Sequence, residues 1–97
     1  MTTGDSRAAA QARIKDLLTL VQAQPAGDTR DRLINECEAL ARAVAAFHME
    51  GIRFRMFNVD RLLSTVEVPA EARTAFASAR RELEAAGFHT RSHQTPT

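Results

Sequence analysis

Residues 47–61, with the sequence FHMEGIRFRMFNVDR, decide the expected fold because they lie within the longest proline-free stretch of the 97-residue chain. Around them one stripe of residues recurs every three or four positions, and the stripe keeps its phase across Gly51. An unbroken phase predicts a single helix over residues 28–66, about 58 Å long at about 1.5 Å per residue. A break near Gly51, which would produce a four-helix bundle, is the alternative. The stripe comprises Leu33, Cys37, Leu40, Val44, His48, Ile52, Arg55, Val59, Leu62 and Val66.

Two shorter helices are predicted to flank this long helix. Residues 6–24 carry an apolar stripe of helical spacing and stop before Pro25, which does not suit a helix interior. Residues 69–87 begin at Pro69, whose missing amide hydrogen is harmless at the first helical position. The expected fold is therefore all-α, with three helices and a long central one. The two flanking stripes are Ala10, Ile14, Leu17, Leu18 and Val21 in the first helix, and Ala72, Phe76, Ala79, Leu83 and Ala86 in the last.

The end of the last helix has its own sequence signal. Gly87 fits the left-handed capping position, and Phe88 is placed to fold back on Leu83, as in a Schellman motif. We therefore expect a single helical domain over residues 1–88. Residues 89–97 are polar and include a proline, so they are expected to form a disordered tail.

The composition argues against several classes of function. Thirteen basic and twelve acidic residues leave a net charge of +1, so no overall charge attracts nucleic acid, and the arginines of the last helix are balanced by glutamates. A nucleic-acid-binding regulator that uses an arginine face is therefore only a further alternative. No apolar stretch is long enough to cross a bilayer, and no secretion signal is expected. The single cysteine, Cys37, cannot form an intramolecular disulfide, which suits a reducing cytoplasm. The chain has no glycine-rich phosphate loop or nucleophile elbow, and no cofactor is expected.

The phenylalanines of residues 47–61 form the main candidate surface. Phe47, Phe54 and Phe57 all lie in this segment, and on a helical projection they fall away from the buried stripe. Two short flanking helices would leave part of this surface exposed, and a contiguous exposed apolar patch usually marks an association site. We therefore predict a homodimer that acts as an interaction or adaptor module, with another protein as a second candidate partner and with Arg53 and Arg61 as the polar rim. The alternative is that the flanking helices bury all three rings.

His48 and Arg55 form a second candidate site, because both belong to the stripe that is expected to face the core. Arg55 could grip the carboxylate or phosphate of an anionic ligand, and His48 could supply a proton or a hydrogen bond. This arrangement would suit a ligand-binding helical bundle or a small enzyme. The structural interpretation, which we prefer, is that Arg55 pairs with a carboxylate of a neighbouring helix and that His48 is a satisfied core histidine.

Metal binding is not expected from the histidines and the cysteine. Cys37 and His48 share a face but lie about 16 Å apart along one helix, which is too far for one coordination shell. His89 and His93 have the spacing of a helical ligand pair, but Gly87 is expected to end the helix before them.

Cys37 is expected to be structural rather than reactive. It is flanked by Glu36 and Glu38, and the field of two carboxylates raises the pKa of a thiol. A thiol that stays protonated is a poor nucleophile, so we expect slow reaction with thiol reagents until the protein is denatured.

Overall fold

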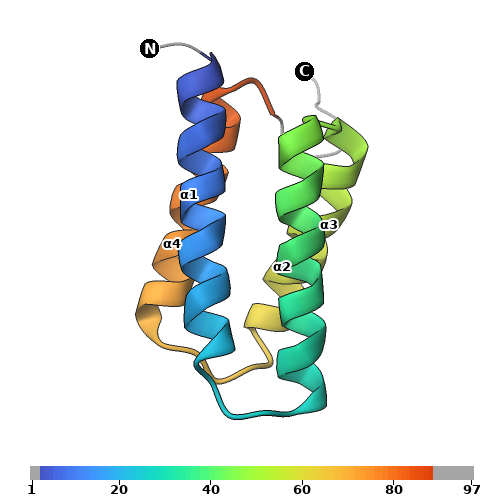
Figure 1. Ribbon diagram of the computed structural model, residues 1–97, viewed down its shortest axis with the longest axis vertical. Coiled ribbons are helices and arrows are strands. Elements are labelled where there is room, and N and C mark those ends of the chain that lie inside the picture. Colours follow the sequence, from blue (N-terminus) through green and yellow to red (C-terminus); the bar gives the residue numbers. More distant parts are fainter. Residues whose placement is uncertain (1–2, 89–97) are drawn as a thin grey trace, which may run out of the picture.

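Four helices, rather than three, form the part of the chain that the computed structural model describes, residues 3–88. The model contains no β-strand within that range, so the all-α class is confirmed. Successive helices run in opposite directions along the long axis of the molecule (Figure 1). The expected tail, residues 89–97, lies outside the described residues. The helices are α1 (Thr3–Gln22), α2 (Asp28–Ala46), α3 (Met49–Leu63) and α4 (Ala70–Ala85).

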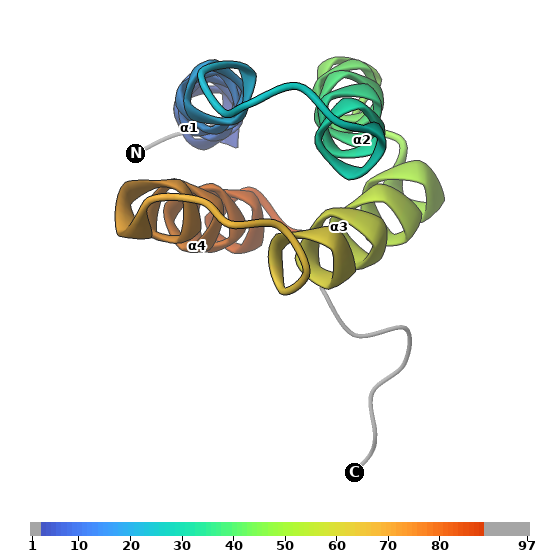
Figure 2. The same ribbon diagram turned by 90° about the horizontal axis from the view of Figure 1, so that it is seen from below.

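The helices occupy the four corners of a bundle when it is viewed along its long axis (Figure 2). The closely packed pairs are α1 with α4, α1 with α2, and α2 with α3. Helix α3 lies obliquely to the others, and the pair α3 and α4 is not among the closely packed ones (Figure 2). At its carboxyl end, α3 is tied to α4 by Arg73, which donates a 2.6 Å hydrogen bond to the Leu63 carbonyl oxygen. The bundle is therefore more open on its α3–α4 side than elsewhere.

Each of the first three helices presents one narrow stripe to the core. In each, the buried apolar residues follow a spacing of four, three and four positions, which keeps them on one face. Helix α4 contributes smaller side chains and Phe76, and its predicted stripe is buried throughout. The core stripes are Ala10, Ile14, Leu17 and Val21 in α1; Leu33, Cys37, Leu40 and Val44 in α2; and Ile52, Met56, Val59 and Leu63 in α3. Burial of these side chains is the main force that holds the four helices together.

The prediction of a single helix over residues 28–66 is wrong, because the chain turns back at Phe47 and His48. Phe47 adopts the left-handed conformation, with φ 48° and ψ 46°. Its N–H donates to the Val44 carbonyl oxygen at 2.9 Å, and the His48 N–H donates to the Ala43 carbonyl oxygen at 3.0 Å. These two bonds make a Schellman motif in which a phenylalanine takes the position usually held by glycine. The alternative of a four-helix bundle is thus confirmed, with the turn just before Gly51.

His48 also starts the next helix, which explains how the turn can be so short. Its Nδ1 atom accepts a 3.0 Å hydrogen bond from the Gly51 N–H, so the imidazole caps the amino end of α3. Gly51 leaves room for this corner: a Cβ atom there would lie 3.1 Å from His48 Nδ1 and 3.5 Å from the Cβ of Ala43. One residue therefore ends the Schellman turn and caps the following helix.

The folded molecule is too short to contain the expected long helix. The molecule measures 41 × 27 × 22 Å, so an uninterrupted helix of about 58 Å would project well beyond it. Folding the segment into a hairpin lets both halves of the stripe face the same core. The apolar spacing is compatible with either arrangement, so the hairpin is selected by burial.

The expected cap at the end of the last helix is confirmed. Gly87 has φ 105°, its N–H donates to the Glu84 carbonyl oxygen, and the Phe88 N–H donates to the Leu83 carbonyl oxygen at 2.9 Å. The Phe88 side chain is fully buried. Pro69, by contrast, is the residue that precedes α4 rather than its first residue, since its ψ of 155° is extended.

Candidate functional site

The outward face of α3 carries the exposed large apolar side chains of the described residues. Phe54 is 57% exposed and Phe57 is 59% exposed. Both lie on the side of α3 opposite to its core stripe, as a helical projection predicts from their spacing. An exposed phenylalanine is costly in water, and two adjacent ones form a patch rather than isolated exceptions.

The two rings belong to a longer row of exposed residues, which we call the outer stripe: Glu50, Phe54, Phe57 and Arg61. Its spacing of four, three and four positions is the same as that of the core stripe, so all four side chains lie within about 60° around the helix axis. The outer stripe runs for about 16 Å, from the first turn of α3 to its last. Helix α3 therefore has a covered apolar face and, opposite to it, an exposed row with two phenylalanines between two charged residues.

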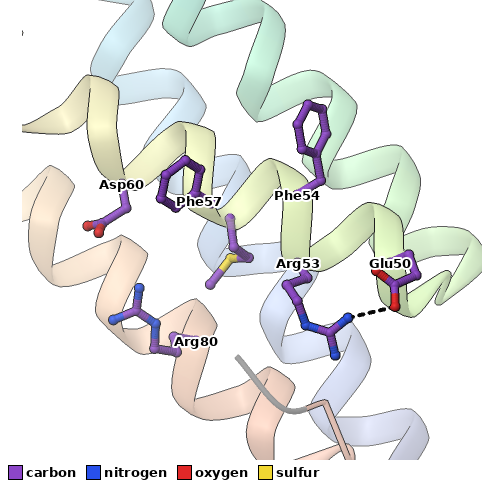
Figure 3. A pocket seen from close by; sticks show the side chains of 7 residues that line it. Glu50, Arg53, Phe54, Phe57, Asp60 and Arg80 are labelled. Carbon is purple, nitrogen blue, oxygen red and sulfur yellow. Dashed lines mark ion pairs between the residues drawn. The ribbon is translucent and has the colours of Figure 1, made fainter. Parts of the chain in front are cut away.

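A groove lies beside the outer stripe, on the open side between α3 and α4 (Figure 3). Its volume is ≈ 520 Å³. Arg53 from α3 and Arg80 from α4 point into it, and Arg53 forms a 3.0 Å ion pair with Glu50 (Figure 3). The residues that line the groove are Glu50, Arg53, Phe54, Met56, Phe57, Asp60 and Arg80. The lining includes two acidic and two basic side chains, so the surface around the phenylalanines has mixed charge.

Arginine side chains hold both exposed rings in place. The Arg55 guanidinium carbon lies 5.0 Å from the centre of the Phe54 ring, and that of Arg61 lies 5.7 Å from the centre of the Phe57 ring. Such cation–π contacts contribute about 0.5–1 kcal/mol each at exposed sites. These contacts favour particular orientations of the two exposed rings.

Arg55 and His48, the candidate ligand-binding pair, both have partners within the chain. Arg55 Nη1 lies 3.0 Å and 3.1 Å from the two carboxylate oxygens of Glu36 on α2, and Asn58 Nδ2 donates to the same carboxylate at 3.3 Å. This pairing confirms the structural interpretation of Arg55. The placement of His48 in the core is wrong, because His48 is exposed and its ring caps α3. The capping role of His48 was not predicted from the sequence, because residues 28–66 were expected to form one unbroken helix.

Phe47 and Arg53, also predicted for the association surface, do not belong to the outer stripe. Phe47 is half-buried against the core at the α2–α3 turn, where the Arg7 guanidinium carbon lies 5.3 Å from the centre of its ring. Arg53 is half-buried and lies beside both Glu50 and the Phe88 ring. Glu50 was missed as a surface residue, although its spacing to Phe54 repeats that of the core stripe and could have revealed it.

Cys37 is fully buried in the core stripe of α2. Burial, and after it the neighbouring charges of Glu36 and Glu38, raise the pKa of its thiol to about 12. The thiol is thus protonated at neutral pH and shielded from reagents, as its sequence neighbours indicated.

We expect Cys37 to react slowly with a thiol reagent in the native protein and rapidly after denaturation.

The pKa of Cys37 rises from 9.0 to about 12 on folding, so between these values the folded state holds a proton that the unfolded chain releases. The free energy of unfolding should therefore fall as pH rises above about 9, by at most about 1.4 kcal/mol per pH unit. Urea denaturation at about pH 8 and about pH 10 measures this slope. Cys37→Ala should reduce it, and an unchanged slope would contradict the assignment.

The described residues offer neither a metal site nor a membrane-spanning helix. Within residues 3–88, no three His, Cys, Asp or Glu side chains come together as they would to hold a metal ion. His89 and His93 fall outside that range. None of the four helices combines the length and the apolarity that a membrane span requires.

Comparison with known proteins adds no family to this description. No protein-family model matches the chain, and no curated protein or solved structure matches it either.

Proposed function

We propose that this protein is a small helical interaction module that acts as a homo-oligomer, with the outer stripe of α3 as its association surface. The observation that carries the proposal is the exposure of Phe54 and Phe57, at 57% and 59%, side by side on the face of α3 opposite the core. Burying two phenylalanines against a partner recovers the hydrophobic free energy that the monomer leaves unused. The arrangement also has the form of a protein interface, with aromatic residues at its centre and arginines around them.

A second copy of the chain is the partner that the charge pattern favours. A surface that binds nucleic acid carries an excess of positive charge, whereas the outer stripe has one acidic end and one basic end. Such a surface has equal charges of both signs, and it can therefore be complementary to itself. The net charge of +1 leaves little overall repulsion between two copies.

We expect the parent protein to have more than the mass of one chain at tens of micromolar, and Phe57→Ala to lose this association. Removing a central aromatic side chain from an interface commonly weakens binding by roughly tenfold or more. Because Phe57 is exposed in the bundle, the variant should keep the helix content and melting temperature of the monomer. Sedimentation measures the mass, and circular dichroism measures the helix content.

The control is Phe76→Ala, which removes a buried phenylalanine from α4 and should lower stability instead. A parent protein that stays at the mass of one chain would refute the proposal. So would a Phe57→Ala variant that keeps the mass of the parent, because the outer stripe would then have no part in the association.

A further inference from the structure

We infer that two copies associate through antiparallel α3 helices about a two-fold axis, with Phe54 against the partner's Phe57 and Glu50 against the partner's Arg61. This inference rests on the proposed self-association and specifies its geometry. Along the outer stripe, an acidic residue and a basic residue enclose two phenylalanines.

The positions along the helix axis make the stripe self-complementary. The midpoint between Phe54 and Phe57 coincides with the midpoint between Glu50 and Arg61. When a second α3 is laid antiparallel about that midpoint, Phe54 reaches the height of the partner's Phe57, and Phe57 reaches the height of the partner's Phe54. Each glutamate then reaches the height of the partner's arginine. A two-fold axis repeats every contact, so the pairing contains two aromatic contacts and two ion pairs.

All four residues are accessible for such a pairing. They lie within about 60° around the helix axis and point away from the core, so one straight contact line can include them all. The Glu50 side chain is 82% exposed although it pairs with Arg53, and Arg61 is exposed although it lies over the Phe57 ring. The spacing of four, three and four positions is that of the seam between two helices of a coiled coil.

Other ways of pairing the same helices bring like charges together. A parallel arrangement would place Glu50 beside the partner's Glu50 and Arg61 beside the partner's Arg61. An antiparallel arrangement centred on Phe57 would place Arg53 at the height of the partner's Arg61. Like charges across an interface disfavour association. Charge therefore selects the antiparallel register in which Phe54 lies against the partner's Phe57.

Charge reversal tests this register directly. Glu50→Arg makes both ends of the outer stripe basic, and Arg61→Glu makes both ends acidic. Each variant alone should raise the dimer dissociation constant roughly tenfold, because two attractive contacts become repulsive at once. An equimolar mixture of the two variants should associate about as well as the parent, since a basic stripe then meets an acidic one. The double variant should also associate with itself, because exchanging both charges restores every pair.

Glu71→Arg is the control for charge reversal at the second residue of a helix, because Glu71 is also exposed and lies away from the outer stripe. It should leave the dissociation constant unchanged. Glu50→Arg also removes the Glu50–Arg53 ion pair within the chain, so recovery in the mixture and in the double variant decides the register. Sedimentation equilibrium of all variants, with circular dichroism to verify the fold, gives the result. If the parent dimerises but the single variants do too, or if the mixture is no stronger than its components, the register is refuted while the proposed self-association stands. A monomeric parent refutes both.

Discussion

Replacing Phe88 by alanine is expected to lower the free energy of unfolding by about 3–5 kcal/mol, a large effect for a chain of this size. Phe88 is fully buried although it follows the last helix, because the left-handed Gly87 turns the chain back over Leu83. Its ring also lies 6.0 Å from the guanidinium carbon of Arg53 on α3. The side chain therefore helps to close the bundle where α3 and α4 are not closely packed.

Thermal denaturation followed by circular dichroism measures this effect, with an expected fall of more than roughly 12 °C in the melting temperature. Phe57→Ala is the matched control, because it removes the same side chain from an exposed position. Both variants should be compared with the parent at a concentration at which all are monomeric, since association itself stabilises a protein. Equal melting temperatures for the two variants would show that the Phe88 ring contributes no more than a surface residue.

Ile52→Ala is expected to cost about 2–5 kcal/mol by leaving a cavity in the core. Ile52 is fully buried in the first turn of α3, close to the α2–α3 turn. Its loss should destabilise the hairpin that replaces the expected long helix. The midpoint of urea denaturation should therefore fall, while a change at Phe57 should leave it nearly unchanged. A small effect at Ile52 would mean that the face of α3 opposite the phenylalanines is not the buried one.

The periodic residues show how far local sequence reasoning extends. The stripes predicted for the first and last helices are buried except for Leu18, which is half-buried, and the Gly87–Phe88 cap forms as expected. These features depend on the identities of residues within one or two helical turns of each other. Such short-range relations can be read from a single chain without knowing its tertiary structure.

The turn at Phe47 could not be read in this way. Phenylalanine is an unusual residue at a left-handed position, and no proline or glycine marks that point. Histidine is not one of the preferred capping residues, so His48 gave no signal for a new helix either. A helical hairpin and a continuous helix share the same apolar spacing, because each half of the hairpin keeps the period of the helix.

The sequence alone determined that this protein is all-helical, where its first and last helices lie, and which faces of these helices are apolar. It also indicated that Cys37 would be an unreactive thiol. Only the tertiary structure decided that residues 28–66 form two antiparallel helices, that Arg55 pairs with Glu36, and that α3 leaves two phenylalanines exposed. The physical reason is that helix formation and apolar spacing are local properties. The direction of the chain after a turn, the partner of a charge and the exposure of a ring depend on contacts between residues that are far apart in sequence.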